Sequence, residues 1–169
     1  YNLNDLDGFL HTKATCKLIF LDGITDTNNF GSIIRTAEWF GIDGIVVSKT
    51  GTAQINDETI KSSSGAIFNL PIYKVDHLMD ALFLVKDQGF KILAADEKSE
   101  KQINGLSLKN KTVIILGSEG KGISPPILKK CDDTFKIALI GKTESLNVSV
   151  ASGIITVSYT HLTLPTMDH

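Results

Sequence analysis

Short apolar runs that alternate with amphipathic helical patterns constrain the fold of this chain more than any other feature. Residues 17–21, 44–47, 91–95 and 112–116 form runs rich in apolar side chains, as expected of strands buried on both faces. The first two runs are separated by a helical pattern that spans 30–40 and stops at a glycine. Strands joined by helices in this way predict an α/β domain with a mostly parallel sheet and helices on both faces.

The remaining elements are predicted from caps, proline positions and shorter β-rich runs. We expect a helix from Asp57 to Ser64 capped by Asn56, a strand from Leu70 to Tyr73, a helix capped by Asp76 that runs to Gln88, a helix start at Ser124-Pro125, a strand from Phe135 to Leu139, and a last helix near Leu146.

Composition excludes several classes of protein. The 169 residues suit one domain with a sizeable core, and the net charge of −2 gives no global basic surface for nucleic acid. If the chain binds nucleic acid, the affinity must therefore come from a local patch or from another domain. Two cysteines are too few for a disulfide framework or a four-ligand zinc site, and the four histidines fit no metal-ligand spacing. With neither a membrane-length apolar run nor a signal peptide in the sequence, we expect a cytoplasmic protein without metal.

Arg35 is the only arginine among 17 basic residues. Its planar and permanently charged guanidinium binds phosphate or carboxylate in a bidentate manner, which lysine cannot do. The alternative is a chance surface arginine in a protein whose basic residues are otherwise lysines. Asn29, six residues earlier, either lines the same site or caps the helix that carries Arg35.

Two further segments bear candidate chemistry. The segment 117–122, Gly-Ser-Glu-Gly-Lys-Gly, lacks the spacing of a phosphate-binding P-loop. Its glycines suit either close approach of the backbone to a flat ligand or an ordinary turn. The segment 145–151, Ser-Leu-Asn-Val-Ser-Val-Ala, supplies polar side chains for a site or caps for the last helix. The three segments follow predicted strands one, five and six, so we expect them at the edge where parallel sheets bind ligands.

Together the three segments resemble the SpoU–TrmH family of RNA ribose 2′-O-methyltransferases. The family pattern is Asn-x-Gly-x-x-x-Arg-x-Ala, then Gly-x-Glu-Gly-x-Gly, then Ser-Leu-Asn-Val-Ser-Val-Ala, and this chain matches all three in order. The segments 21–31 and 53–56 look most like the bacterial branch that methylates a guanosine in 23S ribosomal RNA. The chain departs from the family at 137–139, where Ile-Ala-Leu replaces the usual Ile-Pro-Met.

The resemblance implies a SPOUT fold with a C-terminal trefoil knot, S-adenosylmethionine as cofactor, and a homodimer whose site is built across the interface. The residues that it places at the cofactor are Ala95, Gly117, Ile137 and Leu146. Those that it places at the catalytic site and the substrate are Asn29, Arg35, Glu119, Ser145 and Asn147.

The expected organisation has three parts. Residues 1–16 are a linker or remnant of an N-terminal RNA-binding domain absent from this chain, 17–155 are the methyltransferase domain, and 156–169 are a non-native tail. The expected function is methyl transfer to a ribose 2′-hydroxyl, of a guanosine in 23S ribosomal RNA. The alternatives are a transfer RNA ribose methyltransferase, a noncatalytic RNA-binding or assembly factor of the same fold, and a flavodoxin-like nucleotide-binding protein.

Overall fold

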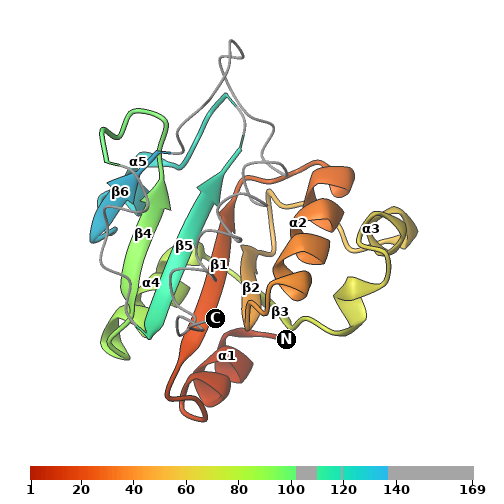
Figure 1. Ribbon diagram of the computed structural model, residues 1–169, viewed down its shortest axis with the longest axis horizontal. Coiled ribbons are helices and arrows are strands. Elements are labelled where there is room, and N and C mark those ends of the chain that lie inside the picture. The colour runs from red at the N-terminus through yellow and green to blue at the C-terminus, as the bar shows by residue number, and fades with distance from the viewer. Residues whose placement is uncertain (102–109, 119, 137–169) are drawn as a thin grey trace, which may run out of the picture.

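A computed structural model of the chain describes residues 1–101, 110–118 and 120–136 (Figure 1). Its centre is a six-stranded sheet in the order β3-β2-β1-β5-β4-β6, and all neighbouring strands run parallel. The predicted α/β class is therefore confirmed. The strands are β1 (Cys16–Asp22), β2 (Gly44–Ser48), β3 (Ile72–Val75), β4 (Lys91–Ala95), β5 (Lys111–Gly117) and β6 (Asp133–Phe135).

Helices cover both faces of this sheet, as the continuous apolar strands predicted. Successive residues of β1 point to opposite faces, so Ile19 and Leu21 pack in one apolar core while Leu18 and Phe20 pack in the other. The first core includes α2 and η1, and the second includes α1, α4 and α5. The helices are α1 (Leu3–Leu10), α2 (Thr27–Trp39), α3 (Asp57–Ser62), the 3-10 helix η1 (Ala66–Phe68), α4 (Leu78–Asp87) and α5 (Pro125–Leu128).

Two predicted caps are confirmed and one is wrong, and the alternative in which Asn29 caps its helix is wrong as well. Asn56 caps α3, and Ser124 precedes α5 with proline in the first helical position. Asn29 does not cap α2, because Asp26 takes the cap position and its carboxylate accepts the N–H groups of residues 28 and 29 at 2.8 and 3.1 Å. Asp76 does not cap α4 either, since His77 holds that position and Asp76 pairs instead with Lys49 at 3.2 Å.

Three other elements differ from expectation. The third strand starts at Ile72 rather than Leu70, because Pro71 lacks an N–H and contributes only the carbonyl that accepts from Ile45 at 3.0 Å. The sixth strand starts two residues early, at Asp133. Helix α1 was not predicted, although Asn2 opens it with a capping box.

Several expectations lie outside the described residues, namely the trefoil knot, the last helix near Leu146 and the tail 156–169. Residues 1–16 contain a helix that buries Leu6 and Leu10 against the sheet, and their origin as a linker stays a prediction. Within the described ranges, no helix is long and apolar enough to cross a membrane, and no group of three or more potential metal ligands gathers.

Candidate functional site

The carboxyl ends of β1 and β5 meet side by side at the centre of the sheet. Asp22, the last residue of β1, lies opposite Gly117, the last residue of β5. The chain leaves β1 toward α2 on one face of the sheet, and it leaves β5 toward α5 on the other face. Open α/β sheets bind ligands at the carboxyl edge where the chain diverges in this way. Of the first two predicted segments, Gly117 and Asn29 lie at or near this edge, whereas Arg35 lies further along α2.

The glycine loop, residues 117–122, folds back on the strand that leads into it. The Gly122 N–H donates to the Ser118 carbonyl at 2.8 Å, and the two residues form an isolated antiparallel bridge. Gly120 and Gly122 have φ values of 81° and 65°, which glycine adopts without strain. A Cβ on Gly117 would lie 2.3 Å from the carbonyl carbon of Gly122. Gly117 is therefore required by the turn itself, whose backbone fills the space beside it.

Asp22 ties this loop to the end of β1. Its Oδ2 atom accepts the Ser124 N–H at 2.7 Å, so one carboxylate joins residues 102 positions apart and fixes where the glycine loop enters α5. Asp22 also lines a shallow pocket of about 310 Å³ at the carboxyl edge, together with Ser48, His77 and Ile127 among others. The sequence analysis missed this residue. The available signal was a carboxylate at the end of a buried strand next to Gly23.

Asn29 and Arg35 lie on α2, but only Asn29 lies near the carboxyl edge. Asn29 is half-buried in the first turn of the helix. Arg35 is exposed and six residues further on, about 9 Å along the helix axis at 1.5 Å per residue. It forms no ion pair with the part of the chain that the structure describes. Arg35 therefore lies further from the carboxyl edge than Asn29 does, and its exposed position is also what a chance surface arginine would show.

Trp39 lies one helical turn beyond Arg35, on the same side of α2. It is the single tryptophan of the chain and is 75% exposed. The outer face of α2 thus presents a large apolar side chain next to the lone guanidinium.

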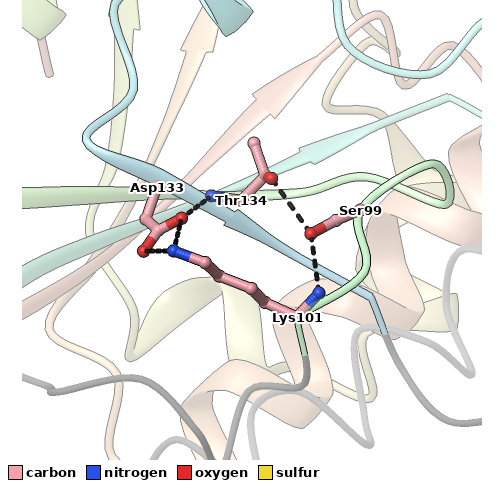
Figure 2. A network of polar contacts seen from close by, with 4 residues as sticks. All are labelled: Ser99, Lys101, Asp133 and Thr134. Carbon is pink, nitrogen blue, oxygen red and sulfur yellow. Dashed lines mark hydrogen bonds and ion pairs between the residues drawn. The ribbon is translucent and has the colours of Figure 1, made fainter.

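Ala95 ends β4 at the same edge and pairs in register with Phe135 of β6. It is half-buried, and the following loop, residues 96–101, is anchored to β6 by the network in Figure 2. The Lys101 Nζ atom lies 3.0 and 2.9 Å from the two carboxylate oxygens of Asp133, and the Thr134 hydroxyl contacts the Ser99 hydroxyl at 3.0 Å. The hydrogen bond from Lys101, together with the Thr134 N–H, lowers the pKa of Asp133, so this carboxylate is charged at neutral pH.

The two cysteines are not candidates for nucleophilic chemistry. Burial raises the pKa of Cys16 to about 12 and that of Cys131 to about 11. Because the thiolate is the reactive form, both thiols are inert at neutral pH.

The structure thus describes Asn29, Arg35, Ala95 and Gly117 of the predicted site. Ala95, Gly117 and Asn29 lie along one edge of the sheet, whereas Arg35 lies further down α2. The other five predicted residues lie outside the described ranges: Glu119, Ile137, Ser145, Leu146 and Asn147.

Comparison with known proteins gives matches over most of the chain. The model of the SpoU rRNA Methylase family matches residues 17–157. A tRNA/rRNA methyltransferase of Archaeoglobus fulgidus, itself uncharacterised, is 41% identical over 137 residues, which cover 81% of this chain and 61% of that protein. A Staphylococcus aureus protein assigned to the TrmH family of tRNA/rRNA methyltransferases is 33% identical over 159 residues, which cover 92% of this chain and 64% of that protein.

Among solved structures, the SpoU methyltransferase AviRb from Streptomyces viridochromogenes in complex with AdoMet superposes with a TM-score of 0.80 at 26% identity. The match covers 89% of this chain and 58% of that one. The chain therefore spans about three fifths of the length of the relatives that it matches.

Proposed function

The chain belongs to the SpoU rRNA methylase family, and we propose that it transfers a methyl group from S-adenosylmethionine to a ribose 2′-hydroxyl of RNA. The observation that carries the proposal is the edge where Asp22 and Gly117 end neighbouring strands, with Ala95 and Asn29 close along it. Two family motifs that are far apart in the sequence supply Asn29 and Gly117. The AdoMet complex of AviRb, which has the same fold, supports the choice of cofactor.

The described residues fit such a cofactor. Ala95 and Gly117 are small and half-buried at the ends of β4 and β5, so main-chain groups are accessible there for hydrogen bonds to a ligand. When bound, the cofactor supplies a methyl group on a positively charged sulfonium. Ile137 and Leu146 complete the proposed contacts.

The protein must then orient the ribose and allow its hydroxyl proton to leave. The sulfonium loses its charge in the transition state, so the pocket has no new charge to stabilise at sulfur, and positioning dominates. Arginine side chains are permanently charged in proteins, so Arg35 suits binding of an RNA phosphate or ribose oxygen better than acting as a base. Asn29, Glu119, Ser145 and Asn147 are the proposed partners that hold the substrate.

A homodimer would account for the position of Arg35. Since Arg35 is exposed on α2, about 9 Å along the axis from the first turn, a second copy packed on this helix would receive it into its own site. Tryptophan and arginine are the residues most enriched at the centres of interfaces. The adjacent exposed Trp39 therefore supports α2 as the contact between protomers.

Ribosomal RNA is the proposed substrate, with a guanosine of 23S ribosomal RNA as the target and the cytoplasm as the place of action. The support comes from the segments 21–31 and 53–56, which resemble the bacterial branch that methylates 23S ribosomal RNA. The two segments are in contact, because the Ala53 N–H donates to the Ile24 carbonyl at 2.8 Å. Transfer RNA is the alternative, and the two relatives carry both substrates in their names.

Calorimetric titration with S-adenosylhomocysteine tests the cofactor, and methyl transfer to 23S ribosomal RNA and transfer RNA transcripts tests the substrate. We expect saturable binding of one ligand per protomer. Arg35→Lys should keep that affinity and the melting temperature while methyl transfer falls at least about tenfold, since lysine cannot make the bidentate contact. A folded protein that binds no S-adenosylhomocysteine would favour the noncatalytic alternative, and wild-type turnover by Arg35→Lys would remove the role given to arginine.

A further inference from the structure

The polar network in Figure 2 joins the loop that follows Ala95, a proposed cofactor contact, to strand β6. We call the pairs Lys101–Asp133 and Ser99–Thr134 the β4–β6 clamp. We propose that this clamp positions the main chain that holds the cofactor, an inference that rests on the proposed function. Its four members are positioning residues, because they act through the backbone of their neighbours.

Main-chain hydrogen bonds join residues 96 and 101, which bound the described part of the loop after β4, to β6 and to the residue that follows it. At one end the Asp96 N–H donates to the Phe135 carbonyl at 2.8 Å, and at the other the Lys136 N–H donates to the Lys101 carbonyl at 2.8 Å. Ala95 directly precedes the first of these bonds, and residue 137 directly follows the second. The clamp therefore acts on the main chain beside Ala95, the described one of these two proposed cofactor contacts.

Main-chain pairing with β4 alone stabilises β6 only weakly. The strand has three residues, and in the described sheet it pairs only with β4. Strand pairs this short are marginal without further support. The clamp adds side-chain links at two successive residues of β6, Asp133 and Thr134.

The chemistry of the clamp suits a positioning role. Ser99 is 9% exposed, and its hydroxyl oxygen lies 3.2 Å from the Lys101 N–H and 3.0 Å from the Thr134 hydroxyl, so this nearly buried polar group has partners. Lys101 and Asp133 are more exposed, with 62% and 25% of their side chains accessible. Exposed ion pairs contribute little to global stability. Loss of this pair should therefore change cofactor affinity more than the melting temperature.

The test compares Lys101→Met and Asp133→Asn with wild type in calorimetric titrations with S-adenosylhomocysteine. Lys98→Met is the matched control, because it removes an exposed lysine of the same loop that forms no ion pair within the described ranges. We expect Kd to rise about three- to tenfold in both clamp variants and not in the control, with melting temperatures within about 2 °C of wild type. The swap Lys101→Asp with Asp133→Lys should recover most of the affinity.

Hydrogen exchange at the Asp96 and Lys136 amides measures how strongly the clamp holds these main-chain hydrogen bonds in the absence of cofactor. Faster exchange at both amides in the clamp variants, together with the loss of affinity, supports the proposal. Wild-type affinity in both clamp variants would overturn it, as would an equal loss in Lys98→Met. Failure of the wild-type protein to bind S-adenosylhomocysteine would instead overturn the proposed function, and the positioning role with it, whatever the exchange rates.

Discussion

Alanine at position 117 would place a Cβ atom 2.3 Å from the carbonyl carbon and 2.5 Å from the carbonyl oxygen of Gly122. These are backbone atoms, which cannot rotate away as a side chain can. To restore an ordinary contact of at least 3.4 Å, the glycine loop must retreat by about 1.1 Å from the end of β5. That movement strains or breaks the 2.8 Å hydrogen bond between Gly122 and Ser118.

The cost can be worked from these contacts. Overpacking of this kind costs about 1–3 kcal/mol, and a lost hydrogen bond adds about 1 kcal/mol. Gly117→Ala should therefore lower the free energy of unfolding by roughly 2–4 kcal/mol, which leaves a typical domain folded. We expect the melting temperature to fall by roughly 5–15 °C. Affinity for S-adenosylhomocysteine should fall about tenfold or more, since a misplacement of about 1 Å disrupts a positioned site.

Urea denaturation and calorimetric titration of the same preparations measure both effects. Gly8→Ala is the matched control, because Gly8 is exposed within α1 and a Cβ there meets no atom within 4 Å. This control should gain about 0.5–1 kcal/mol from helix propensity and keep its ligand affinity. If Gly117→Ala unfolds and binds like wild type, the close approach of the glycine loop to β5 is refuted.

Three further predictions concern capping, strand anchoring and pH. Asp26→Ala removes the cap of α2 and should cost about 1 kcal/mol in a urea melt, while Asp26→Asn should retain most of it. Asp43→Ala removes the carboxylate that accepts the Lys17 N–H at 2.8 Å and should cost about 1–3 kcal/mol, whereas Asp43→Asn keeps an acceptor and should cost less. The pKa of Asp133 is lowered in the folded protein, mainly by its hydrogen bond with Lys101. The stabilisation from this ion pair is therefore fully present above the ordinary pKa of a carboxylate, and it is lost as the pH falls through the lowered pKa. Melting temperatures measured from pH 6 to about pH 2 should therefore drop further in wild type than in Asp133→Asn, and parallel curves would contradict this.

Local elements could be predicted from the sequence where a single physical signal dominates. The fourth strand was placed at its observed bounds, because an apolar run ends in a polar loop. Asn56 and Ser124 were recognised because a polar cap or a following proline starts a helix by local chemistry alone. Asp76 shows the limit of local reasoning. It lies near the start of α4 but pairs with Lys49 from another loop, so it does not cap the helix.

The arrangement of the site depended on contacts that no local pattern encodes. The pairing of β1 with β5, and hence the neighbourhood of Asp22 and Gly117, is a choice of strand order. The rise of 1.5 Å per residue separates Asn29 and Arg35 by about 9 Å along α2. This separation is inconsistent with the expectation that both residues lie at one edge of the sheet. The Asp22–Ser124 hydrogen bond joins residues more than a hundred positions apart and could not be anticipated.

The central strand pair also has a consequence for synthesis of the protein. The first residues of β1 and β5 are Cys16 and Lys111, so 95 residues must be added after β1 begins before its second neighbour starts to emerge. At translation rates of about 5–20 residues per second, this interval lasts roughly 5–20 s. During that time one edge of β1, with Ile19 and Phe20 beside it, has no strand to pair with. An unpaired strand edge of this kind can pair with another molecule, so a low concentration of nascent chains, or a chaperone that covers the edge, should favour correct folding.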